Sequence, residues 1–219
     1  IRTSMPTIKH CLNNGASVVL MSHLGRPGGQ FDDDLSLDPI AFDVEDLLDI
    51  DVHFSKDCIS KESIELSHSL KPGEVHLLEN LRFHDTETTN DDVFSLLLSQ
   101  HGDVYVNDAF GTAHRAHASN VGVVQYIDTV VPGFLMEKEW EFLSTGLNEP
   151  EQPYMVILGG AKVSGKIELI HHLMEKANTI LIGGAMAFTF LKVQGKNIGA
   201  SLVDEENLTV AEEILKTAA

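Results

Sequence analysis

Short apolar runs alternate along the chain with segments in which apolar positions recur every three or four residues. The runs are rich in Val, Ile and Leu, which is typical of buried strands, and the spaced pattern is typical of helices that cover a sheet. Strands are expected at 17–21, 75–78, 104–106, 155–158 and 179–182, with a weaker candidate at 51–54. Helices are expected at 6–14, 39–49, 61–70, 91–100, 163–176, 185–193 and 208–217. This alternation predicts an α/β fold with mainly parallel sheets.

A break in the pattern near the middle of the chain indicates two lobes. Pro132 and Gly133 precede a charged amphipathic segment, and the stretch 148–153 contains two prolines that end any helix. We therefore expect a first lobe over residues 1–133, a connecting helix and linker over 134–152, and a second lobe over 153–219.

The composition excludes several classes of partner. The chain has 33 acidic and 15 basic residues and a formal charge of -18, which disfavours binding to nucleic acid or to an anionic membrane. No apolar stretch reaches the roughly 18 residues of a membrane span, and residues 1–12 do not resemble a signal peptide. Cys11 and Cys58 are too few for a disulfide framework, so two buried thiols in a cytosolic protein are expected.

Against this acidic background, an arginine follows each of three predicted strands. These residues are Arg26, Arg82 and Arg115. Ligands of open α/β sheets bind beyond the carboxyl ends of the strands, and a guanidinium group binds phosphate or carboxylate through paired hydrogen bonds. The sequence therefore predicts a basin for a small anion. For any one of these arginines, an unrelated surface position is the alternative.

Two histidines flank the third arginine. His114 and His117 have the three-residue spacing of metal ligands on a helix, but no further ligand follows with a recognisable spacing. Hydrogen bonding around an anion, or packing of the loop, is favoured over metal binding.

The turn after the strand expected at 155–158 carries glycines and lysines. Gly160 and Lys166 have P-loop spacing, but Ile167 stands where that motif places a hydroxyl for magnesium. Glycines at a strand-to-helix turn expose backbone N–H groups, and a helix N-terminus favours negative charge. Lys162 lies four residues before Lys166, so both are expected on one helical face. A phosphate site is predicted here, with two solvated lysines as the alternative.

A similar glycine turn, residues 182–185, follows the strand expected at 179–182 and would form another wall of the same cleft. One lobe thus offers a basin for a small anion, and the other a turn suited to polyphosphate. Together with a possible hinge, this pairing indicates phosphoryl transfer with domain closure.

Five stretches of the chain, in order, resemble the phosphoglycerate kinase family. They are residues 22–27, 77–82, 107–117, 132–139 and 158–163, and they are spread over essentially the whole chain. The resemblance implies two Rossmann-like lobes with mainly parallel sheets joined by an interdomain helix, the second lobe being incomplete. It also implies a monomeric, cytoplasmic, hinge-bending enzyme of glycolysis. Such an enzyme transfers a phosphoryl group between 1,3-bisphosphoglycerate and MgADP, giving 3-phosphoglycerate and ATP.

The resemblance also implies roles for individual residues. The positions matching the family's triose-binding residues are His23, Leu24, Gly25, Arg26, Arg82 and Arg115. Those matching its nucleotide-binding residues are Gly160, Ala161, Lys162, Lys166 and Gly184, with Lys162 also catalytic and Mg²⁺ arriving with the nucleotide. No protein-bound metal site is expected.

The chain departs from the family pattern in several places. The family's catalytic arginine would fall one position before Ile1, so Arg2 is not that residue. The family's N-terminal strand segment and most of its nucleotide domain have no counterpart, and Gly165 and Ala185 stand where relatives often have Asp and Gly. The chain assayed alone is therefore expected to show little or no kinase turnover. The alternatives are a non-catalytic anion-binding α/β module and a different nucleotide-dependent kinase, which Ile167 disfavours.

Overall fold

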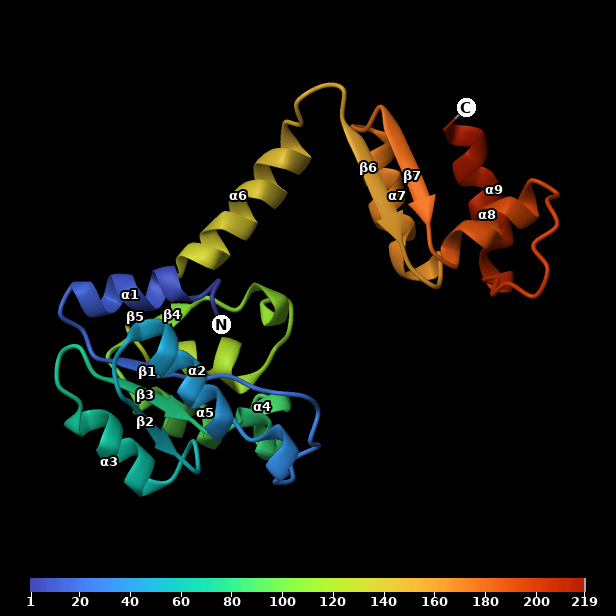
Figure 1. The fold of residues 1–219 in the computed structure, drawn as a ribbon. Coiled ribbons are helices and arrows are strands. Elements are labelled where there is room, and N and C mark those ends of the chain that lie inside the picture. The colour runs from blue at the N-terminus through green and yellow to red at the C-terminus, as the bar shows by residue number, and fades with distance from the viewer. Residues whose placement is uncertain (219) are drawn as a thin grey trace. The chain divides into compact units, whose positions relative to one another are not determined.

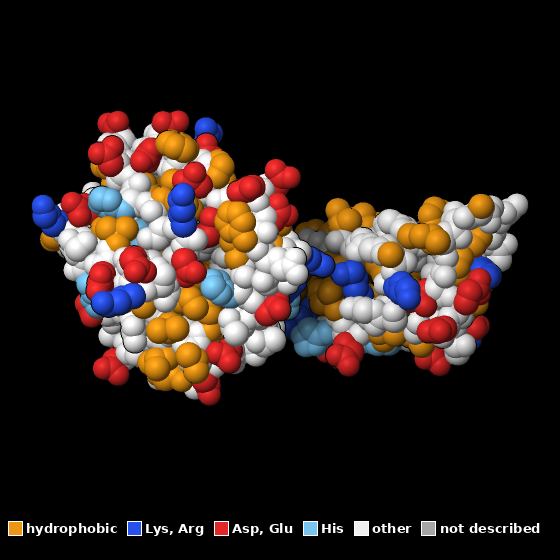
Figure 2. All heavy atoms as spheres, turned by 90° about the horizontal axis from the view of Figure 1, so that it is seen from below, with side chains coloured by type: hydrophobic (Ala, Val, Ile, Leu, Met, Phe, Trp, Pro, Cys, Tyr) orange, Lys and Arg blue, Asp and Glu red, His pale blue; other side chains and the backbone are white. Residues whose placement is uncertain are grey.

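A computed structural model describes residues 1–218 and divides the chain into two compact units (Figure 1). The units comprise residues 1–139 and 140–219, and the division falls within helix α6 (Phe134–Asn148). No described helix combines the length and the apolar character that a membrane crossing requires. Acidic side chains outnumber basic ones on the face shown in Figure 2, in keeping with the composition.

The first unit contains two parallel sheets. Strand β3 (Val75–Leu78) lies between β1 (Val18–Leu20) and β2 (Val52–Ser55), and β4 (Val104–Asn107) pairs with β5 (Thr129–Pro132). The helices around these sheets are α1 (Met5–Asn13), α2 (Asp38–Leu48), α3 (Lys61–Ser69), α4 (Asp85–Thr88) and α5 (Asp92–Ser99). The predicted α/β fold with parallel sheets is confirmed.

Local sequence explains where several of these helices begin. Ser60 Oγ accepts a hydrogen bond from Ser63 N at the start of α3, and Asp91 Oδ1 accepts one from Phe94 N at the start of α5. These side chains satisfy N–H groups that have no partner inside the helix. Proline occupies the first turn of α1 and of α2, where its missing N–H costs nothing.

Strand β3 is the centre of the first unit, because all four of its residues are buried. Successive side chains of a strand point to opposite faces. Val75 and Leu77 accordingly join one apolar cluster with residues of α2, whereas Leu78 joins another with Phe94 and Leu98 of α5. The other strands of this unit are less buried than their apolar sequences suggest, and Val104 of β4 is 55% exposed.

A buried chain of polar side chains crosses the first unit beside β3. Ser67 Oγ lies 2.9 Å from His76 Nδ1 and 2.7 Å from His101 Nδ1. His101 Nε2 must donate to the Cys58 carbonyl oxygen, so a neutral His101 accepts the Ser67 proton at Nδ1. His76 Nδ1 then donates to Ser67 Oγ, and His76 Nε2 accepts from Ser55 Oγ. Burial lowers the pKa of both imidazoles, so both are neutral at pH 7.

The second unit is built on one parallel pair, β6 (Met155–Gly159) and β7 (Thr179–Gly183). Its helices are α7 (Ile167–Met174), α8 (Met186–Val193) and α9 (Leu208–Thr217). The core consists of Val163, Ile170, Met186, Phe190, Ala211 and Ile214. The expectation of buried strands is wrong for one face of this pair, because Met155, Ile157 and Leu181 are 57%, 74% and 47% exposed.

Most element ends lie within two residues of the predicted ones, and three regions differ. The short helix α4 was not predicted. Strand β5 was not predicted, because its residues precede Pro132-Gly133 and belong to the segment interpreted as a lobe boundary. The helix expected at 163–176 is shorter: a 3₁₀ turn covers Ser164–Lys166, and α7 begins at Ile167. Of the two thiols, Cys58 is buried as predicted, whereas Cys11 is only half-buried.

Candidate functional site

The three arginines of the first unit line one cavity of about 370 Å³. Arg26 follows β1, Arg82 follows β3 and Arg115 follows β4, so each comes from the carboxyl end of a parallel strand. The remaining lining residues are Gly28, Gly29, His84, Asp85, Thr88 and His117. The expectation that the arginines share one basin is confirmed, and the binding of a substrate there stays a prediction.

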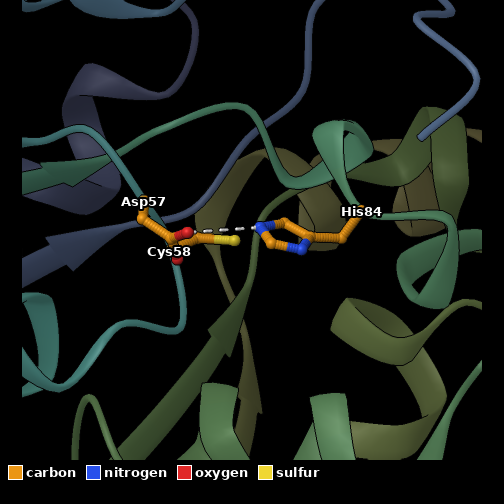
Figure 3. Close-up of side chains that lie close together, drawn as sticks. All are labelled: Asp57, Cys58 and His84. Carbon is orange, nitrogen blue, oxygen red and sulfur yellow. Dashed lines mark ion pairs between the residues drawn. The ribbon is translucent and has the colours of Figure 1, made fainter. Parts of the chain in front are cut away.

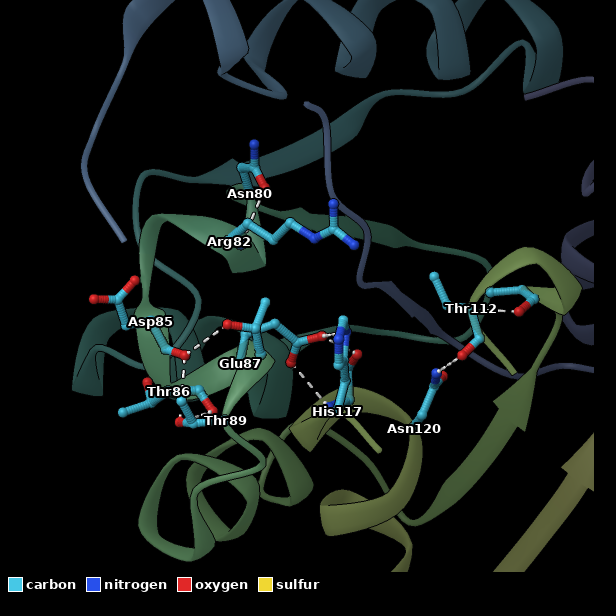
Figure 4. A network of polar contacts seen from close by, with 12 residues as sticks. Asn80, Arg82, Asp85, Thr86, Glu87, Thr89, Thr112, His117 and Asn120 are labelled. Atoms are coloured by element: carbon cyan, nitrogen blue, oxygen red, sulfur yellow. Dashed lines mark hydrogen bonds and ion pairs between the residues drawn. The ribbon is translucent and has the colours of Figure 1, made fainter. Parts of the chain in front are cut away.

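Arg82 is the most firmly held of these arginines. Its side chain extends over the site in Figure 4, its Nη1 donates to the Gly25 carbonyl oxygen at 2.9 Å, and the residue is 9% exposed. Burial and the nearby charge of Arg115 lower the pKa of the Arg82 guanidinium. Its Nε is buried and has no hydrogen-bond partner among the described residues. A buried donor without a partner costs free energy.

The Asn80 side chain holds the backbone of Arg82 and the loop after β1 in place. The side chain is fully buried; its Nδ2 donates to the carbonyl oxygens of Leu24 and Leu35, and its Oδ1 accepts from Arg82 N. One amide thus ties together three segments of the site. The neighbouring Glu79 accepts from Leu37 N at 2.8 Å.

His23, Leu24 and Gly25 lie beside the cavity but are not among its lining residues. Leu24 and Gly25 contribute carbonyl oxygens that anchor Asn80 and Arg82. His23 is half-buried, and its pKa is lowered by burial first and then by the charge of Arg82. The imidazole of His23 is therefore neutral near pH 7 and can donate or accept a hydrogen bond.

The two histidines near Arg115 differ in their surroundings. His117 lines the cavity and is 9% exposed, whereas His114 is exposed and is not among the lining residues. His117 Nδ1 lies 3.6 Å from Glu87 Oε1, and Glu87 also accepts hydrogen bonds from the backbone and hydroxyl of Ser119 (Figure 4). His117 therefore packs in the loop beside the cavity, which is one of the two roles favoured from the sequence.

A close backbone approach explains one glycine of the cavity wall. Gly29 has a φ of +74°, and a Cβ at this position would lie 2.1 Å from Asp85 Oδ1. Its N–H donates to the Arg82 carbonyl oxygen. A side chain here would be strained by the positive φ and would require the Asp85 carboxylate to move.

In the second unit, the structure brings some of the predicted nucleotide-binding residues together. A Cβ on Gly184 would lie 3.0 Å from the Gly160 carbonyl oxygen, so the two glycine turns pack backbone to backbone. A Cβ on Gly160 would lie 3.2 Å from Lys166 Cε, so the lysine side chain also packs closely against this turn. Ala161 and Lys162 are exposed in the loop before the 3₁₀ turn. The prediction that Lys162 and Lys166 share a helical face is wrong.

Asp204 explains this difference and was missed by the sequence analysis. Its Oδ2 accepts hydrogen bonds from Val163 N at 3.0 Å and Ser164 N at 3.1 Å. These contacts and the hydrogen bond from Asn207 Nδ2, which is the largest cause, lower the pKa of the Asp204 carboxyl. The carboxylate thus takes two N–H groups of the turn that the sequence analysis assigned to a phosphate.

Replacing Asp204 by alanine is expected to destabilise the second unit by about 2 kcal/mol, because charge-assisted hydrogen bonds to Val163 and Ser164 are lost. Faster hydrogen exchange at these two amides would report the change locally. The exposed Glu206 provides the matched control, and its alanine variant should exchange like the wild type. Unchanged protection in the Asp204 variant would contradict the capping role.

Several residues of the site carry no signal in the local sequence. Glu87 and Asp204 act through partners tens of residues away. Asn80 and His84 follow the end of β3, and this position is the local sign of their place in the site. Gly29 belongs to a glycine pair in the loop after β1, which is the one local clue to close packing there.

The comparisons with known proteins agree with one another. The sequence profile described as phosphoglycerate kinase matches residues 1–219. The chain is 52% identical over 215 residues to a phosphoglycerate kinase of Pelodictyon phaeoclathratiforme, covering 98% of the chain and 54% of that protein. It is 52% identical to that of Moorella thermoacetica, covering 100% of the chain and 56% of the relative.

Solved structures give the same result. Phosphoglycerate kinase from Coxiella burnetii matches with a TM-score of 0.82 and 35% identity, over 99% of this chain and 54% of that one. The enzyme from Pyrococcus horikoshii matches with a TM-score of 0.83 and 32% identity, over 98% of this chain and 56% of that one. The chain therefore spans about half the length of the relatives that it matches.

Proposed function

Since the chain belongs to the phosphoglycerate kinase family, we propose that the cavity of the first unit binds 3-phosphoglycerate and 1,3-bisphosphoglycerate. The observation that supports this most directly is the arrangement of the three arginines around one cavity. A small acid with a phosphate and a carboxylate offers oxygens to several guanidinium groups at once. The neutral His23 adds a hydrogen bond near the same ligand.

We further propose that the glycine-lysine turn of the second unit binds the phosphates of MgADP and MgATP. Gly160 and Gly184 allow close backbone approach, Ala161 is exposed in the same turn, and Lys166 adds a charge beside Gly160. The exposed Lys162 would contact the transferring phosphoryl group and act as the catalytic lysine. Mg²⁺ enters with the nucleotide as part of the substrate.

In the whole protein these sites would support reversible phosphoryl transfer between 1,3-bisphosphoglycerate and MgADP, giving 3-phosphoglycerate and ATP in glycolysis. Catalysis would then consist mainly of positioning and charge stabilisation, as in other phosphoryl transfers. A monomeric state, a cytoplasmic location and hinge bending about residues 134–152 stay predictions that follow from the family.

Isothermal titration calorimetry of the purified protein tests the proposal. 3-Phosphoglycerate is expected to bind at least tenfold more tightly than glycerate, which lacks the phosphate and hence the charge-assisted hydrogen bonds. MgADP is expected to bind at a second, independent site. Absence of heat with 3-phosphoglycerate would overturn the triose site. Binding of 3-phosphoglycerate without any binding of MgADP would favour the alternative of an anion-binding module, in which Asp204 fills the second turn.

A further inference from the structure

A second cavity of the first unit is lined by three side chains that can bind a metal ion. They are Asp57, Cys58 and His84, and one ligand atom of each lies within 4.8 Å of those of the other two. Figure 3 shows the Asp57 carboxylate and the Cys58 sulfur turned toward the His84 ring. The cavity measures about 160 Å³. It does not include any of the three arginines of the first cavity, although His84 lines both.

The parallel sheet brings these residues together. Asp57 and Cys58 follow the end of β2, and His84 follows the 3₁₀ turn Leu81–Phe83 after β3, so both segments leave the same edge of the sheet. We propose that Asp57, Cys58 and His84 form a binding site for a thiophilic divalent cation of the Zn²⁺ class. This proposal does not depend on the proposed kinase function.

The side chains are oriented for this role before any metal binds. Asp57 Oδ1 accepts hydrogen bonds from Ile59 N at 2.7 Å and Ser60 N at 3.0 Å, which leaves Oδ2 facing His84 Nε2 at 3.7 Å. The His84 ring packs against Phe94, with ring centroids 5.3 Å apart. Such outer contacts fix the direction of metal ligands.

The donor set selects the type of metal. One sulfur, one imidazole nitrogen and one carboxylate oxygen suit Zn²⁺ or Co²⁺ in tetrahedral coordination and do not suit Mg²⁺ or Ca²⁺, which prefer oxygen. Ligand atoms around tetrahedral zinc lie about 3.5 Å apart, from Zn–N of about 2.0 Å and Zn–S of about 2.3 Å. The three ligand atoms lie within 4.8 Å of one another, and the pair Asp57 Oδ2 and His84 Nε2, 3.7 Å apart, is already near that separation.

The fourth ligand would be water in the cavity. Glu79 also lines the cavity, but its carboxylate oxygens accept hydrogen bonds from Leu37 N, Asn80 N and Ser36 Oγ. Cys58 is 1% exposed and forms no disulfide. On metal binding its S–H bond would break, an S–metal bond would form and the proton would leave to solvent. Lys56, the one lysine that lines the cavity, is exposed.

Titration of the purified protein with Co²⁺ tests the site, because a cysteine thiolate bound to Co²⁺ gives a sulfur-to-metal charge-transfer absorption band. We expect one saturable site with this band in the wild type and in Cys11→Ser, which keeps one free thiol and is the matched control. The band should disappear in Cys58→Ser, and Zn²⁺ should displace the Co²⁺. Asp57→Asn should weaken Co²⁺ binding at least tenfold.

The Asp57 variant guards against a folding defect in the Cys58 variant, because its side chain is 43% exposed and circular dichroism can verify its fold. The proposal is overturned by a wild type without a saturable band, by a band that persists in Cys58→Ser, or by unchanged Co²⁺ affinity in Asp57→Asn.

Discussion

Replacing Arg115 by alanine is expected to weaken the binding of 3-phosphoglycerate by about 30- to 150-fold, or 2–3 kcal/mol. Arg115 lines the cavity, and among the described residues no carboxylate forms a salt bridge with it. Its backbone N–H bonds to the Thr112 carbonyl oxygen and is unaffected by the substitution. The lost free energy should therefore appear in ligand binding, as measured by calorimetry, with little change in stability.

Two further variants make this experiment specific. Arg2→Ala removes the same charge from an exposed position outside the cavity and should leave affinity nearly unchanged. Arg115→Lys keeps the charge but loses the planar pair of donors, so an intermediate affinity is expected. If Arg115→Ala and Arg2→Ala bind 3-phosphoglycerate equally well, Arg115 does not contact the ligand. Arg82 is less suited to this test, because its Nη1 donates a hydrogen bond to the Gly25 carbonyl oxygen. Its replacement would therefore also disturb the loop after β1.

Acidification from pH 7 to pH 5 is expected to lower the free energy of unfolding of the first unit by about 2 kcal/mol through His76 alone. Burial, with smaller contributions from the charges of His101 and His53, lowers the pKa of His76 from 6.5 to about 4. Between these values the unfolded chain binds the proton and the folded chain does not, so stability is full above pH 6.5 and is lost as the pH falls toward 4. Burial lowers the pKa of His101 as well, which adds to the effect in the same direction.

The first unit needs its own readout, since the single tryptophan, Trp140, belongs to the second unit. Hydrogen exchange of the β3 amides at pH 7 and pH 5, corrected for the intrinsic rates, provides one. His76→Leu removes the titrating ring and should reduce the pH dependence by about 2 kcal/mol. His114→Gln is the matched control, because His114 is exposed and contributes to the pKa shift of neither His76 nor His101. An equal pH dependence in wild type and His76→Leu would show that another group causes the acid sensitivity.

The sequence alone was sufficient to predict the fold class and the arginine-lined cavity of the first unit. Short runs rich in Val, Ile and Leu and helical runs of period 3.6 are local properties, so they located β3 at 75–78 and α9 at 208–217 without reference to the rest of the chain. Ligands of α/β folds bind beyond the carboxyl ends of strands, and from this rule the sequence analysis predicted that Arg26, Arg82 and Arg115 would meet, although β4 lies in a separate sheet from β1 and β3.

Only the tertiary structure revealed which distant groups complete these sites. The Asp204 carboxylate caps a turn some 40 residues earlier in the chain, which removed the expected helical face of Lys162 and Lys166. Asn80 fixes the loop of Leu24 from 56 residues away, and the ligand set of Asp57, Cys58 and His84 has no regular spacing. The periodicity of apolar positions shows which face of a segment is exposed to water and which is buried in the core. The partner of a buried polar group depends instead on which loops the packed sheet brings to the same edge, and no local pattern encodes that choice.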